Sequence, residues 1–267
     1  MKKLIPILIS CLFLSACSEY QKVLKSSDYE KKYQAAVRYF DEKDYFKSLT
    51  LLEELISVYK GTKNAEKIYY YYSYCNYYQG DYELAAYHFD NFVKTFPNSE
   101  WTEECSFMNA YCYYANAPVY SLDQSSNYKA IAQLQLFIDR YPGSAKVSKC
   151  NELIDQLREK LERKDYENSK LLYDMGDYKS AIFAFGNFLK DYPNTPHREG
   201  ALFSILKASY LYAGSSIEKK RAERYKAALE AYYAFTSAFP QSRHRREAQL
   251  IFEDSLKLIE KFKQVNS

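Results

Sequence analysis

Residues able to support enzymatic chemistry are few and scattered in this 267-residue sequence. Its three histidines, His88, His197 and His244, stand far apart, and none belongs to the H-E-x-x-H pattern that places two zinc ligands on one helix face. The adjacent pairs Glu53-Glu54 and Glu103-Glu104 point to different sides of a helix, because only residues three or four apart share a face. The sequence therefore predicts a protein that is not an enzyme and has no cofactor or metal site.

Cys17 is the residue with the clearest chemistry. A charged start and an apolar run at residues 4–14 precede Leu14-Ser15-Ala16-Cys17, in the order of a signal peptide and its cleavage site. The run is shorter than the roughly 20 residues that a membrane-spanning helix needs. The last four residues resemble a lipobox, so residues 1–16 are predicted to be a lipoprotein signal peptide and Cys17 the acylated (for example palmitate-bearing) first residue. The alternative is a secreted soluble protein in which Cys17 is incidental.

The residues after Cys17 bear on the location of the protein. Neither an Asp nor an acidic cluster follows Cys17 directly, which by resemblance to lipoprotein sorting rules favours the outer membrane, with the protein facing the periplasm. Residues 17–29 are then a lipidated tether. Two or three acyl chains anchor it durably, because each buried methylene contributes about 0.8 kcal/mol and a single chain holds only marginally.

The remaining cysteines and the charge balance exclude other classes of site. The four cysteines beyond Cys17 and the signal-peptide cysteine form no C-x-x-C pair. They could pack as small apolar residues or form disulfides in the periplasm; the four are Cys75, Cys105, Cys112 and Cys150. Without the two lysines of residues 1–16, 35 basic residues stand against 34 acidic ones. This near neutrality argues against nucleic acid as a partner.

A repeated motif organises the elements of the chain. Asp caps a second helix, Ala and aromatic residues at three- and four-residue steps form its apolar stripe, Pro ends it, and the Ser or Thr two residues later is the expected N-cap of the next first helix. The clearest copy is Gly80-Asp81-Tyr82, Ala85, Phe89, Phe92, Phe96-Pro97 and Ser99. Other copies end at Tyr141-Pro142, Tyr192-Pro193 and Phe239-Pro240, and the first copy, over residues 44–60, is degenerate.

The motif resembles the tetratricopeptide repeat (TPR), with polar insertions at residues 115–126 and 213–223 that lengthen it. First helices are expected at residues 30–43, 64–79, 100–116, 145–174 and 197–214, the fourth as one helix or two pieces. The predicted fold is all-α, a right-handed superhelical solenoid of about five helix pairs over residues 30–267. The expected repeats are approximately residues 30–62, 63–99, 100–144, 145–195 and 196–267.

A lipobox followed directly by aromatic-rich repeats resembles the BamD family of outer-membrane β-barrel assembly lipoproteins. The sequence pattern is similar to that of the Bacteroidetes-type members. The resemblance is carried by Cys17-Ser18-Glu19-Tyr20-Gln21-Lys22-Val23-Leu24-Lys25-Ser26, by Tyr120-Ser121-Leu122-Asp123-Gln124 and by residues 130–142. It implies a non-enzymatic subunit of the Bam machinery. Its N-terminal repeats would bind unfolded outer-membrane β-barrel proteins, and its C-terminal repeats a BamA-type insertase.

Two sets of residues are candidate contacts for such partners. Tyrosines of the first helices suit a peptide groove, because their rings are flat and amphipathic; the candidates are Tyr69, Tyr72, Tyr74, Tyr77, Tyr111 and Tyr114. About half of the tyrosines in these helices are expected in the repeat core instead. Basic residues suit an insertase contact, with ordinary solvated surface as the alternative; the candidates are Arg221, Arg224, Arg243, Arg245 and Arg246.

A competing function is that of a periplasmic TPR scaffold lipoprotein linked to Tol and cell-envelope coordination. Proteins of that kind usually carry an N-terminal coiled coil and an ordinary cleavage site. This sequence has neither feature, which favours the assembly role.

Overall fold

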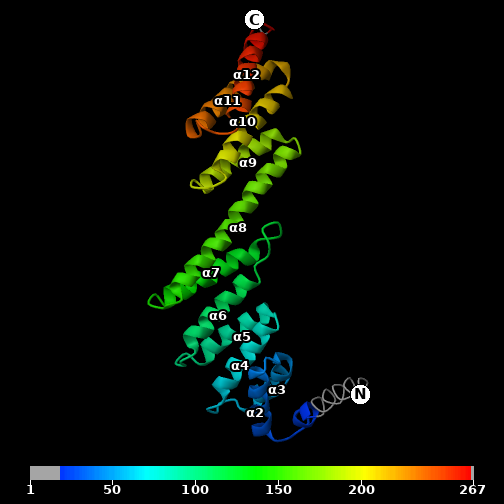
Figure 1. Cartoon of the computed structure of the whole chain (residues 1–267), viewed down its shortest axis with the longest axis vertical. Coiled ribbons are helices and arrows are strands. Elements are labelled where there is room, and N and C mark those ends of the chain that lie inside the picture. Colours follow the sequence, from blue (N-terminus) through cyan, green and yellow to red (C-terminus); the bar gives the residue numbers. More distant parts are fainter. Residues whose placement is uncertain (1–18, 266–267) are drawn as a thin grey trace, which may run out of the picture. The chain divides into compact units, whose positions relative to one another are not determined.

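The computed structural model describes residues 19–265. Every regular element in that range is an α-helix, beginning with a short helix at residues 19–24 (Figure 1). Cys17 and the predicted signal peptide at residues 1–16 lie outside the described residues. The all-α prediction is therefore confirmed for the part of the chain that the structure describes.

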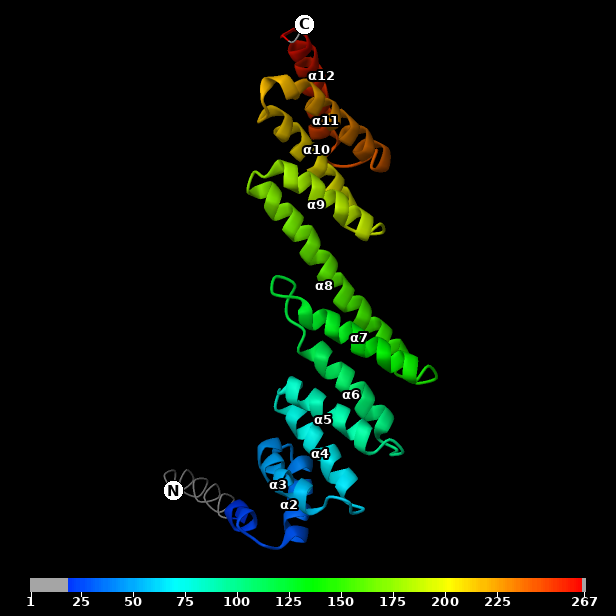
Figure 2. The ribbon, with the colours of Figure 1, turned by 180° about the vertical axis from the view of Figure 1, so that it is seen from behind.

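Packing divides the chain into two compact units, Met1–Leu157 and Arg158–Ser267, with the division inside α8 (Val147–Asp174). Unit 1 contains α2 (Tyr29–Asp41), α3 (Tyr45–Val58), α4 (Ala65–Tyr78), α5 (Tyr82–Thr95), α6 (Thr102–Ala115) and α7 (Ser125–Arg140). Unit 2 contains α9 (Tyr178–Asp191), α10 (Arg198–Gly214), α11 (Glu218–Ala238) and α12 (Arg245–Val265). From α2 to α7 and from α9 to α12, each helix packs on the next one in the chain (Figure 2). This order of helix pairs is that of a TPR-type repeat protein.

The first helices begin and end within two residues of their predicted bounds. The fourth of them, α8, is a single helix of 28 residues rather than two pieces. The repeat motif gave no sign of α12, because the last copy ends at Pro240. This helix covers the last pair: Ile259 and Phe262 are buried with Tyr225 of α11.

The turn between the two helices of a pair has the predicted chemistry. Gly80 and Gly176 adopt φ angles of 83° and 82°, in the left-handed region that lets a helix end without a side-chain clash. Lys43 takes the same place in the first pair, at φ 62°. An Asp follows each of them as N-cap, and Asp44 and Asp177 accept hydrogen bonds from the N–H groups of the first turn, whereas Asp81 makes no such bond.

The Ser or Thr after each repeat proline lies in a turn rather than at a helix N-cap. Its hydroxyl oxygen accepts a hydrogen bond from the backbone N–H two residues further on, at 3.0–3.1 Å; the four residues are Ser99, Ser144, Thr195 and Ser242. The N-cap of α6 is Trp101 and that of α10 is His197. The N-cap prediction is therefore wrong: this hydroxyl stabilises the turn that precedes the first helix.

The repeated aromatic positions of the second helices form the cores of both units. Five phenylalanines are at most 1% exposed, namely Phe89, Phe92, Phe137, Phe185 and Phe235. Burial of one such side chain contributes about 1.5–3 kcal/mol. The apolar stripe read from the sequence thus provides the main packing energy of each helix pair.

The four remaining cysteines are free thiols with no exposed surface. Burial raises the pKa of Cys75 and of Cys112 to about 12 and that of Cys150 to about 11. Since the thiolate is the reactive form, these side chains pack as small apolar groups. Cys105, whose pKa burial also raises, belongs to the same core cluster as Cys112.

None of the helices in the described range is both long and apolar enough to cross a membrane.

Candidate protein-binding sites

Tyr74, one of the six candidate groove tyrosines, is a core residue. It is 8% exposed, and its ring centroid lies 5.0 Å from that of Phe89. Its hydroxyl donates a hydrogen bond of 2.8 Å to Glu104 of α6, whose other carboxylate oxygen lies 2.8 Å from the Lys146 ammonium. Burial, together with the neighbouring Tyr70 and Glu104, raises the pKa of Tyr74. Tyr74 therefore joins α4 to α6 within unit 1 and does not offer a free ring.

Tyr69 and Tyr72 lie around His88 of α5 and are half-buried. The Tyr69 hydroxyl is 3.1 Å from His88 Nδ1, and the Tyr72 ring meets the imidazole edge-on with centroids 4.7 Å apart. Burial raises the pKa of both tyrosines. Tyr87, which is 58% exposed, closes the cluster on the solvent side.

The other three candidates continue the rings from α4 onto α6. The centroids of Tyr77 and Tyr111 are 6.2 Å apart, and those of Tyr111 and Tyr114 are 5.7 Å apart. Burial raises the pKa of Tyr77 to about 12. The Tyr114 hydroxyl donates a 2.5 Å hydrogen bond to Gln156. These three residues are half-buried and form a continuous row, the aromatic row, and peptide contact by this row stays a prediction.

The His88 cluster predicts that the stability of unit 1 depends on pH. Burial lowers the pKa of His88, against a weaker opposing effect of Asp81, so the unfolded chain binds a proton more readily than the folded one. The buried, neutral His88 ring contributes its full stabilisation above the ordinary imidazole pKa of about 6.5. This stabilisation is lost as the pH falls below that value. We expect a lower urea midpoint at pH 5.5 than at pH 7.5, followed by the fluorescence of Trp101. The drop should be smaller in His88→Gln; an equal drop in both proteins would contradict the assignment.

The five candidate arginines form two separate groups in unit 2. Arg221 and Arg224 lie in the first two turns of α11, whereas Arg243, Arg245 and Arg246 lie beyond its C-terminal end. More than about 20 Å of helix separates Arg224 from the end of α11, at 1.5 Å per residue. The candidate arginines thus belong to two separate basic surfaces of unit 2.

The two groups differ in how firmly they are held. Arg221 donates from Nε to the Ser216 carbonyl at 2.8 Å and lies over the Phe262 ring, 5.2 Å from its centroid. Arg224 donates to the Ser216 hydroxyl and stacks on Tyr212 at 4.0 Å. Arg243, Arg245 and Arg246 are exposed.

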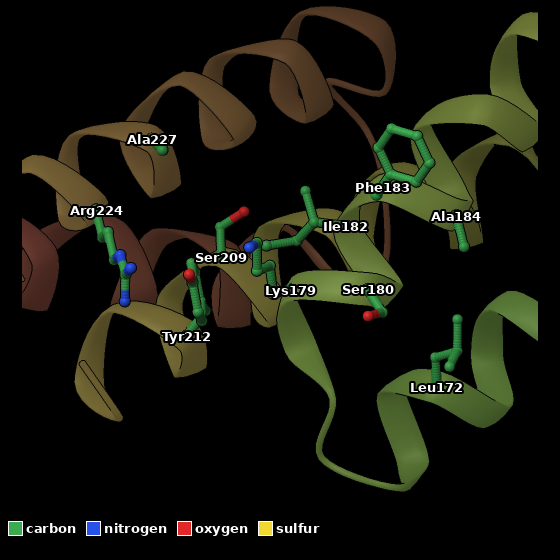
Figure 3. A pocket seen from close by; sticks show the side chains of 10 residues that line it. All are labelled: Leu172, Lys179, Ser180, Ile182, Phe183, Ala184, Ser209, Tyr212, Arg224 and Ala227. Atoms are coloured by element: carbon green, nitrogen blue, oxygen red, sulfur yellow. The ribbon is translucent and has the colours of Figure 1, made fainter.

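A pocket of about 630 Å³ lies beside Arg224 and was not predicted. It is lined by Leu172 of α8, by Lys179, Ser180, Ile182, Phe183 and Ala184 of α9, by Ser209 and Tyr212 of α10, and by Arg224 and Ala227 of α11. Figure 3 shows Arg224 and Tyr212 together at one end and Phe183 and Ala184 at the other. The sequence did hold one signal for it. Phe183 is off the apolar stripe of Ala181, Phe185 and Phe188, and its ring is 71% exposed.

Within residues 19–265 we find no group of three or more His, Cys, Asp or Glu side chains placed to hold a metal ion.

Comparisons with solved structures give distant TPR proteins. The TPR domain of P58(IPK) aligns over 90% of this chain and 68% of its own, with 14% identity and a TM-score of 0.41. A TPR-repeat protein of Bacteroides fragilis aligns over 88% and 100%, with 16% identity and a TM-score of 0.37. The TPR2AB domain of yeast Sti1, in a structure described as its pHSP90 complex, aligns over 86% of this chain and 98% of its own, with 12% identity and a TM-score of 0.40. These likenesses are too weak to assign a function.

Sequence comparison assigns the family. No curated protein matches the chain. The model of the YfiO family, described as outer membrane lipoprotein, matches residues 25–224, which is more than half of the chain. The match runs from before α2 in unit 1 to the second turn of α11 in unit 2. The chain therefore belongs to the YfiO (BamD) family of outer membrane lipoproteins.

Proposed function

We propose that this lipoprotein is a non-enzymatic subunit of the Bam machinery, which folds and inserts β-barrel proteins at the outer membrane. The family match over residues 25–224 is the observation that carries the proposal. In this role Cys17 bears the lipid anchor and the helical units face the periplasm. The sequence of residues 17–26 and 130–142 supports a Bacteroidetes-type member.

The aromatic row of unit 1 is the proposed contact for unfolded β-barrel substrates. Tyr77 and Tyr111 present partly exposed rings whose positions are fixed by packing on their neighbours. Such rings give large contact areas at a low cost in side-chain entropy, because few torsions remain to be fixed. This chemistry suits extended segments rich in aromatic residues.

The two basic surfaces of unit 2 are the proposed contacts for the barrel-shaped insertase. Arg245 donates to the Pro240 carbonyl at 3.0 Å, and Arg243 to the His244 ring at 3.2 Å, so neither is neutralised by these hydrogen bonds. Exposed arginines of this kind favour acidic surfaces on a partner and raise the association rate.

Affinity purification tests the function. The tagged full chain, solubilised from membranes, should recover a barrel-shaped outer-membrane protein that carries periplasmic repeat domains. Recovery of only Tol or peptidoglycan-binding proteins would contradict the proposal and favour the envelope scaffold.

Matched variants then test the two surfaces separately. We expect Arg221→Gln with Arg224→Gln, or Arg245→Gln with Arg246→Gln, to lower insertase recovery severalfold, because each pair removes two charges from one of the two basic surfaces. The control is Lys226→Gln, an exposed lysine of α11. Equal recovery by both double variants and the control would exclude the arginines as the contact.

A further inference from the structure

The pocket of unit 2 occupies a gap between two helices. Both α9 and α11 pack on α10 but scarcely touch each other. Ser209 and Tyr212 of α10 form the floor of the gap, and Ile182 of α9 and Ala227 of α11 face it from the two sides (Figure 3). Nothing within the described residues fills this space.

The pocket in this gap is much larger than the one at the corresponding place in unit 1. In unit 1, α5 and α7 flank α6 in the same order, and a pocket there measures only about 30 Å³ against about 630 Å³ in unit 2. Val93 of α5 and Leu136, Phe137 and Arg140 of α7 are among the residues that line the smaller pocket. The larger pocket falls in the roughly 300–1,000 Å³ range of ligand sites.

The lining of the larger pocket combines apolar walls with two cations. Lys179 stands on α9 and Arg224 on α11, and no carboxylate is among the lining residues. Within the described chain neither cation forms an ion pair. The pKa of the nearby Asp177 is lowered mainly by its hydrogen bonds from Ser180 and only to a smaller extent by the charge of Lys179. The Arg224 guanidinium is held by Ser216 and Tyr212, which leaves other N–H donors for a ligand. A fixed guanidinium loses less entropy when it binds a carboxylate.

We propose that this pocket binds a segment of a partner protein that inserts one or two large apolar side chains and carries acidic residues on either side of them. The apolar walls take the side chains, and Lys179 and Arg224 pair with the flanking carboxylates. The exposed ring of Phe183 then becomes buried at the rim. A fatty acid matches the apolar walls, but its single carboxylate leaves one of the two cations unpaired.

The pocket's chemistry does not depend on which machine the protein serves. The affinity purification described above can fail while the pocket binds its segment, and the reverse also holds. The test therefore uses a defined peptide rather than a cellular partner.

The probe is a fluorescein-labelled twelve-residue peptide with a central Leu-Phe pair and two Glu on each side. Its binding to the full lipoprotein in phospholipid nanodiscs is followed by fluorescence anisotropy. We expect saturable binding that weakens at least about tenfold, or about 1.4 kcal/mol, in Lys179→Gln with Arg224→Gln. Ala227→Trp, which fills the pocket from an exposed position, should abolish it. Lys190→Gln and Lys226→Gln, exposed lysines of the same two helices, should leave it unchanged.

Several outcomes would overturn the proposal. These are no saturable binding, equal affinity for a peptide with Lys in place of Glu, and a loss of affinity as large in the control variants as in the pocket variants. Dodecanoate binding that Ala227→Trp abolishes, with no peptide binding, would assign the pocket to a lipid. Circular dichroism of each variant shows that a loss of binding is not a loss of fold.

Discussion

Replacing Phe92 by Ala is expected to lower the free energy of unfolding of unit 1 by about 3–5 kcal/mol. Phe92 has no exposed surface, and its ring lies 6.3 Å from Tyr70 and 5.1 Å from Phe96, measured between centroids. The substitution removes these contacts and leaves a cavity that the two flanking helices cannot close. An effect of this size is a large part of the total stability of a small domain.

Trp101 provides a measurement confined to unit 1. It is the only tryptophan of the chain, and its ring centroid lies 5.0 Å from that of Tyr70. The urea midpoint of its fluorescence should fall by more than about 1 M in Phe92→Ala, given a dependence of about 1–3 kcal/mol per M. The control is Tyr87→Ala on the same helix, where a ring that is 58% exposed should cost less than about 1 kcal/mol. Equal midpoints for the two variants would contradict the burial of Phe92.

Replacing Cys17 by Ala is expected to release most of the protein from the membrane fraction. The reason is chemical, because in the predicted lipobox the Cys17 sulfur is the atom that would form the thioether to diacylglycerol. Without its two or three acyl chains the mature chain loses its main hold on the bilayer. Incorporation of an alkyne-bearing fatty acid and membrane fractionation measure the two consequences.

Cys150→Ala is the matched control for the anchor. It also removes one thiol, but from a buried position in the core of unit 1, so it should keep both the label and the membrane association. Persistent labelling of Cys17→Ala would show that the lipobox interpretation is wrong.

The repeat could be read from the sequence because its signals are local. Gly80 and Gly176 need a left-handed backbone, Asp177 caps the next helix, and Pro97 stops one; each acts within a few residues of itself. The same locality explains the agreement of the helix bounds. It also explains the error at Ser99, since a hydroxyl ahead of a helix can serve the N-cap or the preceding turn, and the sequence does not distinguish the two.

The candidate sites were harder to predict because they depend on packing between helices. Tyr74 and Tyr77 are neighbours on one helix with the same side-chain type, yet Tyr74 is buried against Phe89 and Glu104 while Tyr77 remains half-exposed. The pocket beside Arg224 arises from the separation of α9 and α11, which no local motif encodes. The family, by contrast, could be recognised from short sequence segments, and the match over residues 25–224 confirms it.

The short helix at residues 19–24 lies within the predicted tether of residues 17–29 and packs on the first core cluster. Tyr20 and Val23 are buried in the first core cluster, the Tyr20 ring meets Tyr39 at 5.7 Å, and Glu19 pairs with Arg38 at 3.2 Å. Only two residues lie between Cys17 and Tyr20, and the three residue steps reach at most about 10 Å. With Cys17 lipidated, Tyr20 and the part of the first helix pair on which it packs stay within about 1 nm of the headgroups. The protein's encounters with a partner embedded in the same membrane then become a two-dimensional search, in which a high local concentration replaces much of the affinity that free diffusion would demand.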